Sequence, residues 1–198
     1  MLFCKTISTA GEAMLKDRTK ELFASGLERM METMPLSKVR VDELCTICGT
    51  GRQTFYYHFH DKYDLVAWIF ERDYRLAQLT VGNDDFVLVV SDALRRMWEK
   101  REFYRKAFAD KSQNSISEYI QDFDVRLMTQ TVCDYLGIDT LSGWQVFAIK
   151  HLSYGSIGCT LEWLQGLLIA SPEELAQWEF DSMPPFLKEA YQASVAHS

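Results

Sequence analysis

The side chains best suited to bind a partner lie between Gly49 and Lys62, in the sequence Gly-Thr-Gly-Arg-Gln-Thr-Phe-Tyr-Tyr-His-Phe-His-Asp-Lys. If the stretch after the second glycine is helical, Phe55 and Phe59 share one face and can anchor it in a core. The other faces carry hydrogen-bonding groups: Gln53, Thr54 and Tyr57 opposite the anchor, Tyr56 and His58 on the flanks, and Arg52 in the first turn. The stretch therefore predicts a short helix that packs through one side and contacts a polar partner through the other.

A second short helix is predicted immediately upstream. Val41, Leu44, Cys45 and Cys48 repeat at helical spacing and are followed by Gly49. Two short helices that meet across a glycine turn have the outline of a helix-turn-helix, whose second helix lies in the major groove of DNA.

From about residue 17 to residue 65, the sequence around this motif resembles the TetR family of bacterial transcription regulators. The match is ordered: Val41-x-x-Leu44-Cys45-x-x-Cys48-Gly49, then Thr54-Phe55-Tyr56-Tyr57-His58-Phe59, then Asp61-Lys62 and Leu65. Two positions depart from the family pattern. Gly51 stands where a Ser or Asn cap is usual, and Arg40 stands where Thr or Ser often caps the preceding helix.

The resemblance implies an all-α protein with an N-terminal three-helix helix-turn-helix domain and a C-terminal helical domain for ligand binding and dimerisation. We expect an N-terminal arm at residues 1–16, the DNA-binding domain at 17–65, and the regulatory and dimerisation domain at 66–198. The pattern after residue 65 agrees, because it shows helical periodicity and no strand alternation.

The chemistry of the side chains divides the expected DNA contacts into two sets. Arg favours guanine and Gln favours adenine through paired hydrogen bonds, so base contacts are expected from Arg52, Gln53, Thr54 and Tyr57. Phosphate contacts are expected from Lys38, Arg40, Tyr56, His58 and Lys62. For His58, a hydrogen bond within the domain is an open alternative.

Charge and composition agree with a protein that binds DNA through one end. The net charge is -7, yet residues 1–65 hold nine basic and nine acidic side chains, so the whole acidic excess follows residue 65. No signal peptide or apolar run of about 20 residues is present. Five cysteines, an odd number, favour free thiols over a disulfide framework. We expect a cytoplasmic protein that does not enter a membrane.

The segment from Ser142 to Ala170 predicts a helix that is apolar on all sides and therefore buried on all sides. Its small residues favour close approach of another helix, and we expect a homodimer interface at Gly155, Ser156, Cys159 and Trp163. Packing within one subunit is the alternative. From Tyr154-Gly155 to Ser171-Pro172-Glu173-Glu174, the sequence resembles a subgroup that includes regulators of dihydroxyacetone kinase operons.

The aromatic residues of the C-terminal region suggest a ligand cavity lined by Trp98, Tyr104, Phe123, Phe147 and Tyr154, although such residues also form ordinary cores. The effector is either a small molecule between helices or a protein co-regulator, which could dock at the polar segment from Lys111 to Ser115.

Catalysis, metal binding and cofactor binding are not expected. Cys45 and Cys48 form a Cys-x-x-Cys pair, but no second pair follows that could complete a zinc site, so core packing is favoured over a redox role. Neither these cysteines nor His151 belongs to a recognisable catalytic group. A protein-interaction adaptor of the same fold, without operator binding, is the alternative function.

Overall fold

The computed structural model describes the backbone of residues 3–81, 85–110 and 115–196, and these residues form helices and connecting turns without strands. The all-α prediction is confirmed. The chain divides into two compact units, Met1–Ile69 and Phe70–Ser198.

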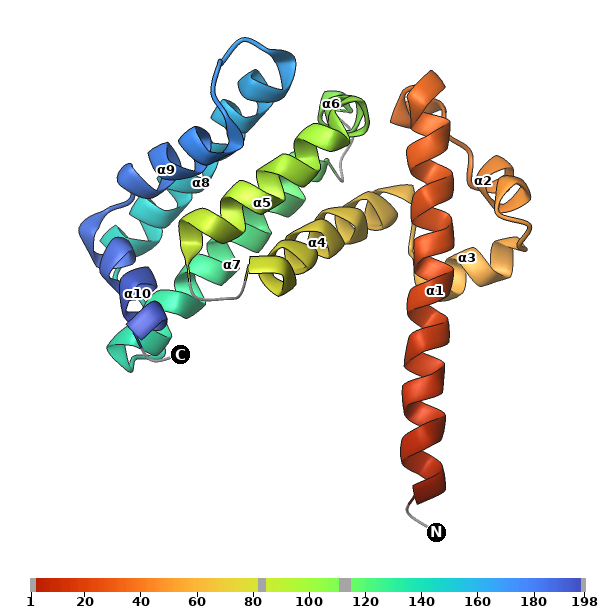
Figure 1. Cartoon of the computed structure of the whole chain (residues 1–198), viewed down its shortest axis with the longest axis horizontal. Helices are drawn as coiled ribbons and strands as arrows, with labels where there is room; N and C mark the ends of the chain where they lie inside the picture. Colours follow the sequence, from red (N-terminus) through yellow and green to blue (C-terminus); the bar gives the residue numbers. More distant parts are fainter. Residues whose placement is uncertain (1–2, 82–84, 111–114, 197–198) are drawn as a thin grey trace. The chain divides into compact units, whose positions relative to one another are not determined.

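The first unit contains α1 (Phe3–Thr33), the short 3-10 helix η1 (Leu36–Lys38), α2 (Val41–Ile47), α3 (Arg52–His58) and the start of α4 (Lys62–Val81). Figure 1 shows α2 and α3 on the same side of α1. The predicted anchor of α3 is confirmed, because Phe55 and Phe59 are buried. The Phe55 ring meets Phe23 of α1 edge to face, with ring centroids 5.2 Å apart.

Helix α1 and helix α2 pack in close contact at Gly26. A Cβ atom at this position would lie 2.6 Å from Cys48 Sγ and 2.9 Å from Leu44 Cδ1. The Cys48 thiol also donates a hydrogen bond to the Leu22 carbonyl oxygen, at 3.5 Å. The absence of a side chain at Gly26 therefore brings α1 against the helix-turn-helix.

The ends of the helices follow the expected chemistry except at α2. Asp61 Oδ1 accepts hydrogen bonds from the backbone N–H groups of Tyr63 and Asp64 and thereby caps α4. Arg40 forms no capping hydrogen bond through its side chain, as the sequence led us to suspect. Asp42 and Glu43 in the first turn of α2 offset this, because acidic groups are favourable at a helix N-terminus.

The second unit begins within α4 and contains α5 (Phe86–Glu99), α6 (Arg101–Ala109), α7 (Ile116–Leu136), α8 (Gly143–Gln165), α9 (Pro172–Asp181) and α10 (Pro185–Ala196). Helix α7 packs against α8 and α10, and α5 packs against α9 (Figure 1).

Helix α9 begins with a capping box between Ser171 and Glu174, and Pro172 lies in its first turn. Pro184 lies between α9 and α10, and Pro185 is the first residue of α10, a position where proline is tolerated. The polar segment from Lys111 to Ser115, suggested above as a docking site, falls largely on residues 111–114, which lie outside the described residues. In the part of the chain that is described, no helix is long and apolar enough to span a membrane.

Candidate nucleic-acid interface and effector cavity

The turn between α2 and α3 is closed by backbone hydrogen bonds and one left-handed glycine. Gly49 has φ of 62°, a conformation that glycine adopts without steric cost. The Thr50 N–H donates to the Cys45 carbonyl oxygen at 2.9 Å, and the Gly49 N–H donates to the Thr46 carbonyl oxygen at 3.1 Å. This turn fixes the direction of α3 relative to α2.

The outward side of α3 carries most of the residues predicted to contact bases. Arg52 and Gln53 are exposed, Thr54 is partly buried, and Tyr57 retains 68% of its accessible surface. Among the predicted phosphate contacts, Lys38, Arg40 and Tyr56 are exposed as well. These side chains share one structural unit and are available to a ligand.

The two arginines of this surface are held by one carboxylate. Arg52 lies 3.1 Å from Asp42 Oδ1, and Arg40 lies 3.6 Å from Asp42 Oδ2. The Arg52 guanidinium also lies over the Tyr56 ring, 5.9 Å from its centroid. Exposed ion pairs contribute only about 0 to 1 kcal/mol, so a phosphate or a guanine can displace Asp42 at little cost.

Lys62 has a different environment from the other predicted phosphate contacts. Its ammonium donates to the carbonyl oxygens of Leu36, Ser37 and Val39, at 2.7, 3.2 and 3.1 Å. Lys62 therefore ties the start of α4 to the chain around η1. This geometry favours a structural role, and we propose that Lys62 stabilises the first unit. His58 is partly buried and packs edge to face on Tyr57, so its two alternatives stay open.

Cys45 is buried, and Cys48, at the C-terminal end of α2, is partly buried against α1. Burial raises the pKa of both thiols, which keeps them protonated at neutral pH and makes them poor nucleophiles. Among the described residues, no group of three or more His, Cys, Asp or Glu side chains could hold a metal ion.

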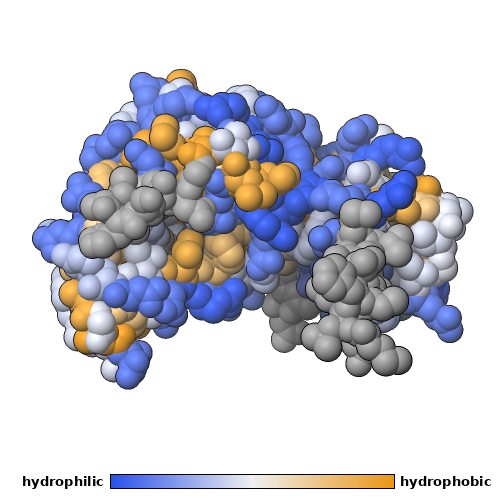
Figure 2. Space-filling model, turned by 60° about the horizontal axis from the view of Figure 1, so that its bottom comes forward, coloured by the Kyte–Doolittle hydropathy of each residue, from blue (hydrophilic) through white to orange (hydrophobic). Residues whose placement is uncertain are grey.

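Helix α8 differs from the sequence prediction, because one of its sides is not covered by the described part of the chain. Trp144, Phe147 and Tyr154 retain 67%, 59% and 55% of their accessible surface. Gly155 and Cys159 are exposed too, and a Cβ atom at Gly155 would meet no atom within 4 Å. The prediction of burial on all sides is therefore wrong for the single chain. Figure 2 shows apolar residues in patches on the surface of the second unit.

Two of the predicted dimer residues point into the subunit instead. Trp163 is buried, its ring lies 4.8 Å from that of Trp98, and its indole N–H donates to the Ala170 carbonyl oxygen at 2.9 Å. Ser156 lines an internal cavity. Gly155 and Cys159 are thus the members of the predicted set that remain accessible to another subunit.

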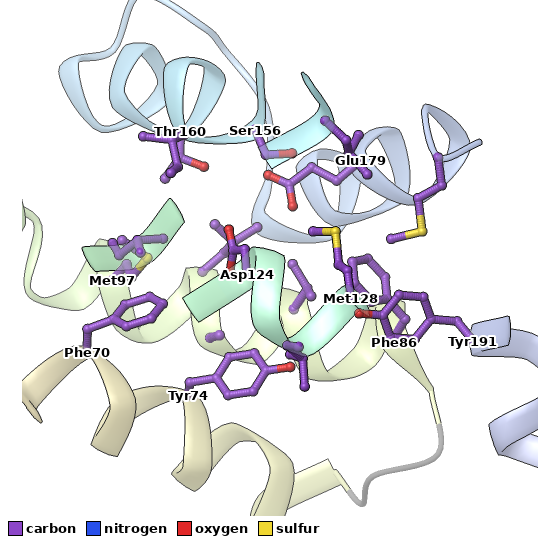
Figure 3. A pocket seen from close by; sticks show the side chains of 18 of the residues that line it. Phe70, Tyr74, Phe86, Met97, Asp124, Met128, Ser156, Thr160, Glu179 and Tyr191 are labelled. Atoms are coloured by element: carbon purple, nitrogen blue, oxygen red, sulfur yellow. The ribbon is translucent and has the colours of Figure 1, made fainter. Parts of the chain in front are cut away.

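The cavity of the second unit has a volume of about 100 Å³ and is enclosed by helices α4 to α10 (Figure 3). Its lining is mostly aromatic, aliphatic and methionine side chains: Phe70, Tyr74, Phe86, Val90, Ala93, Leu94, Met97, Phe108, Ile120, Asp124, Leu127, Met128, Leu152, Ser156, Ile157, Thr160, Glu179, Met183 and Tyr191.

None of the aromatics predicted to line a pocket belongs to this lining. Phe147 and Tyr154 lie on the exposed side of α8, and Trp98 packs on Trp163. The Tyr104 hydroxyl donates to Asp73 Oδ2 at 2.8 Å in a separate buried cluster. Phe123 comes nearest, because its ring packs against Phe70 and Tyr74, which do line the cavity.

The cavity contains two acidic side chains that the sequence analysis did not single out. Asp124 of α7 and Glu179 of α9 both point into it (Figure 3). Burial raises the pKa of Asp124 to about 7. Burial, together with the neighbouring Asp124 carboxyl, raises the pKa of Glu179 to about 8, and a hydrogen bond with the Thr160 hydroxyl opposes this shift. The cost of desolvating a carboxylate explains both directions.

Comparison with known proteins agrees with this architecture. Residues 88–181 match a family described as a transcriptional regulator C-terminal region, TetR_C_8. The chain is 29% identical over 93 residues to the HTH-type dhaKLM operon transcriptional activator DhaS of Lactococcus lactis subsp. lactis (strain IL1403). That match covers 46% of this chain and 49% of the relative, so it spans about half the length of the relative.

A solved structure of a dihydroxyacetone kinase operon activator, DhaS, matches with a TM-score of 0.58. It covers 82% of this chain and 92% of the other, and at 20% identity it supports the fold alone. Residues 88–181 are therefore similar to the C-terminal region of TetR-type transcriptional regulators, and the chain resembles DhaS in sequence over about half its length and in fold.

Proposed function

We propose that this protein is a cytoplasmic transcription regulator that binds a palindromic operator as a homodimer and responds to an effector through its C-terminal unit. The observation that supports this most directly is the polar outer side of α3, with Arg52, Gln53 and Tyr57 exposed on a helix whose inner side is anchored by Phe55. The second helix of a helix-turn-helix reads base edges from such a side.

The uncovered side of α8 supports the homodimer. Trp144, Phe147, His151, Tyr154 and Gly158 are exposed at alternating spacings of three and four residues, the pattern of a helix that packs along another helix. Exposed aromatic side chains in one row are typical of a protein interface, and the glycines allow close approach. A dimer carries two helix-turn-helix units, which binding to successive major grooves, about 34 to 36 Å apart, requires.

The direction of regulation is left open by the residues themselves. The relative that matches in sequence over 93 residues is described as an operon activator, and on this support we propose activation for this chain. The cavity between α4 and α10 favours a small-molecule effector over a docked protein, because it gives such a molecule a place inside the second unit.

The test of DNA binding uses a selected palindromic operator and fluorescence anisotropy at several salt concentrations. Arg52→Ala and Gln53→Ala should each weaken specific binding by about 1 to 3 kcal/mol and relax the preference at one base position. Replacing the exposed Glu43 with Gln is a control of the same unit and should leave the base preference unchanged. Full operator binding by an Arg52→Ala, Gln53→Ala double variant would overturn the assignment of α3 as the recognition helix.

Sedimentation velocity tests the homodimer. Phe147→Arg should give monomers, since a charge cannot be buried in an apolar interface without a partner. Ile169→Arg is a matched control, because Ile169 is equally apolar and 89% exposed but lies outside α8. A dimer that binds no operator would support the adaptor function in place of the regulator.

A further inference from the structure

The two carboxyl groups in the C-terminal cavity have no described counterion. The lining includes Asp124 and Glu179 but no Lys, Arg or His, and within the described residues Asp124 forms no hydrogen bond or ion pair. Glu179 has one partner, the hydroxyl of Thr160. A carboxylate in apolar surroundings is costly unless it is paired, so this pair either stays protonated or meets a cation from outside.

The remaining walls of the cavity suit the body of an organic cation. Phe70, Phe86 and Tyr74 offer aromatic rings, and Met97 and Met128 offer polarisable thioethers (Figure 3). Aromatic rings attract cations through their faces, and methionine adapts to irregular apolar shapes.

We propose that the cavity binds a small organic cation, whose ammonium group lies between Asp124 and Glu179 and whose apolar body packs against the aromatic and methionine walls. The proposal names the chemical class of the effector in the proposed function. It rests on the proposed function only for the effect of the ligand on DNA binding, and not for the binding of the ligand itself. A cavity of about 150 Å³ admits benzene, so a volume of about 100 Å³ suits a body of roughly four heavy atoms, and a body of about six requires small adjustments of the methionines.

Other ligand classes fit these walls less well. An anion would be repelled by both carboxyl groups, and a purely apolar molecule would leave them without a partner. A calcium or magnesium ion needs about six oxygen ligands, whereas the walls around Asp124 and Glu179 are chiefly hydrocarbon and thioether.

The cavity adjoins a second, wider space. A wider depression of about 570 Å³ shares Tyr74, Phe86, Leu127 and Tyr191 with the cavity. Rotation of these side chains would join the two spaces without separating the helices.

The titratable groups facing the site come from α4, α7, α9 and α10: Tyr74, Asp124, Glu179 and Tyr191. Both tyrosines stay neutral near pH 7, because burial raises their pKa, that of Tyr74 to about 12. Helices α5, α6 and α8 supply only apolar or hydroxyl side chains to the lining. Cation binding should therefore strengthen as pH rises from 6 to 8.5, by about tenfold, because the carboxyls ionise while a primary amine, with a pKa near that of lysine, stays charged.

The test is isothermal titration of the DNA-free protein with n-hexylamine, and with 1-hexanol as the neutral analogue. We expect the amine to bind at least about tenfold more tightly than the alcohol at pH 8, with Asp124→Asn and Glu179→Gln each abolishing that preference. Glu189→Gln, on the exposed side of α10, should retain it. Thermal melts establish that each variant is folded. Equal binding of amine and alcohol by the wild-type protein, or no amine binding, would overturn the proposal.

Operator affinity measured with and without n-hexylamine separates this inference from the proposed function. If the amine binds and operator affinity is unchanged, the cation site stands and the effector role of the cavity fails. If the protein binds no operator yet prefers the amine, the cation site stands and the DNA-binding function fails. If operator binding is intact but the amine is not preferred, only the cation site fails.

Discussion

The two units of this chain differ in how directly sequence position determines the environment of a side chain. In the first unit (residues 1–69, here called the head), the short helix α3 has one buried side and one exposed side. Residue spacing alone therefore predicts that Phe55 is buried and Tyr57 is exposed. In the second unit (residues 70–198, here called the body), helices α4 to α10 enclose a cavity, and the environment of each side chain depends on which neighbouring helices cover it. Local patterns are therefore reliable where one surface meets solvent, and less so where several helices meet.

The largest effect that tests this comparison is expected within α3 itself. Phe55→Ala should lower the free energy of unfolding by about 3 to 5 kcal/mol, because it removes a fully buried ring in contact with Phe23. Tyr57→Ala, two residues away and 68% exposed, should change it by about 0.5 kcal/mol or less. Urea denaturation of both variants measures the difference. Equal losses would show that α3 has no distinct outer side.

A second prediction concerns the interior of the body and is read from the pH dependence of stability. The pKa of Asp124 is raised in the folded protein to about 7 and that of Glu179 to about 8, whereas unfolded carboxyls titrate near pH 4. The folded state thus holds these protons more tightly, and their favourable contribution is present at low pH. It is lost as pH rises from about 4 through 8.

Asp124→Asn should remove part of this loss and stabilise the protein at pH 8 by an amount on the order of 1 to 3 kcal/mol, with little gain at pH 4. Asp122→Asn, on the exposed side of the same helix, is the control and should not change the slope. Denaturation midpoints between pH 4 and 8.5 provide the measurement. A wild-type protein whose stability does not fall over this range would contradict the desolvation of the Asp124 carboxyl in the folded state.

The next effect separates two lysines of the head that the sequence analysis treated alike. Lys62→Ala should cost about 1 to 3 kcal/mol of stability, because three carbonyl oxygens around η1 lose a charged donor. Lys38→Ala should leave stability almost unchanged and reduce the salt dependence of operator binding by about one ion. Melting curves and salt titrations distinguish them. If Lys62→Ala changed only the salt slope, the original assignment to phosphate would be correct.

The fold could be predicted almost completely because its determinants are local. Apolar spacing, Asp61 before α4, and the Ser171 capping box placed the helices without knowledge of the tertiary structure. The outward residues of α3 followed from the same periodicity. Lys62 could not be assigned this way, because its partners lie 23 to 26 positions earlier in the sequence.

The residues that line the cavity could not be predicted, for a related reason. The aromatic content of the body suggested a pocket, but large rings such as Tyr104 and Trp163 fill space and the cavity lies elsewhere. A signal was present in Asp124, which sits four residues after Ile120 and three before Leu127 on an otherwise apolar side of α7. Glu179 occupies a similar position between Ala176 and Met183. An acidic residue at a core position of a helix is a better indicator of a binding cavity here than aromatic content.

The smallest predicted effect returns to the head and concerns Asp42, the carboxylate that holds Arg40 and Arg52 in the free protein. Asp42→Asn should strengthen operator binding by a few tenths to about 1 kcal/mol, because both guanidinium groups are released and one negative charge near the DNA is lost. Its effect on stability should be small, since favourable charge at the N-terminus of α2 is lost along with exposed ion pairs.

Glu43→Gln is the control, because it removes an equal charge from the same first turn and so separates the effect of the ion pairs from the general effect of charge. Anisotropy titrations at low salt, where exposed charges are least screened, give the sharpest comparison. If both variants strengthened binding equally, net charge alone would account for the gain, and the Asp42 pair would have no part in positioning Arg52.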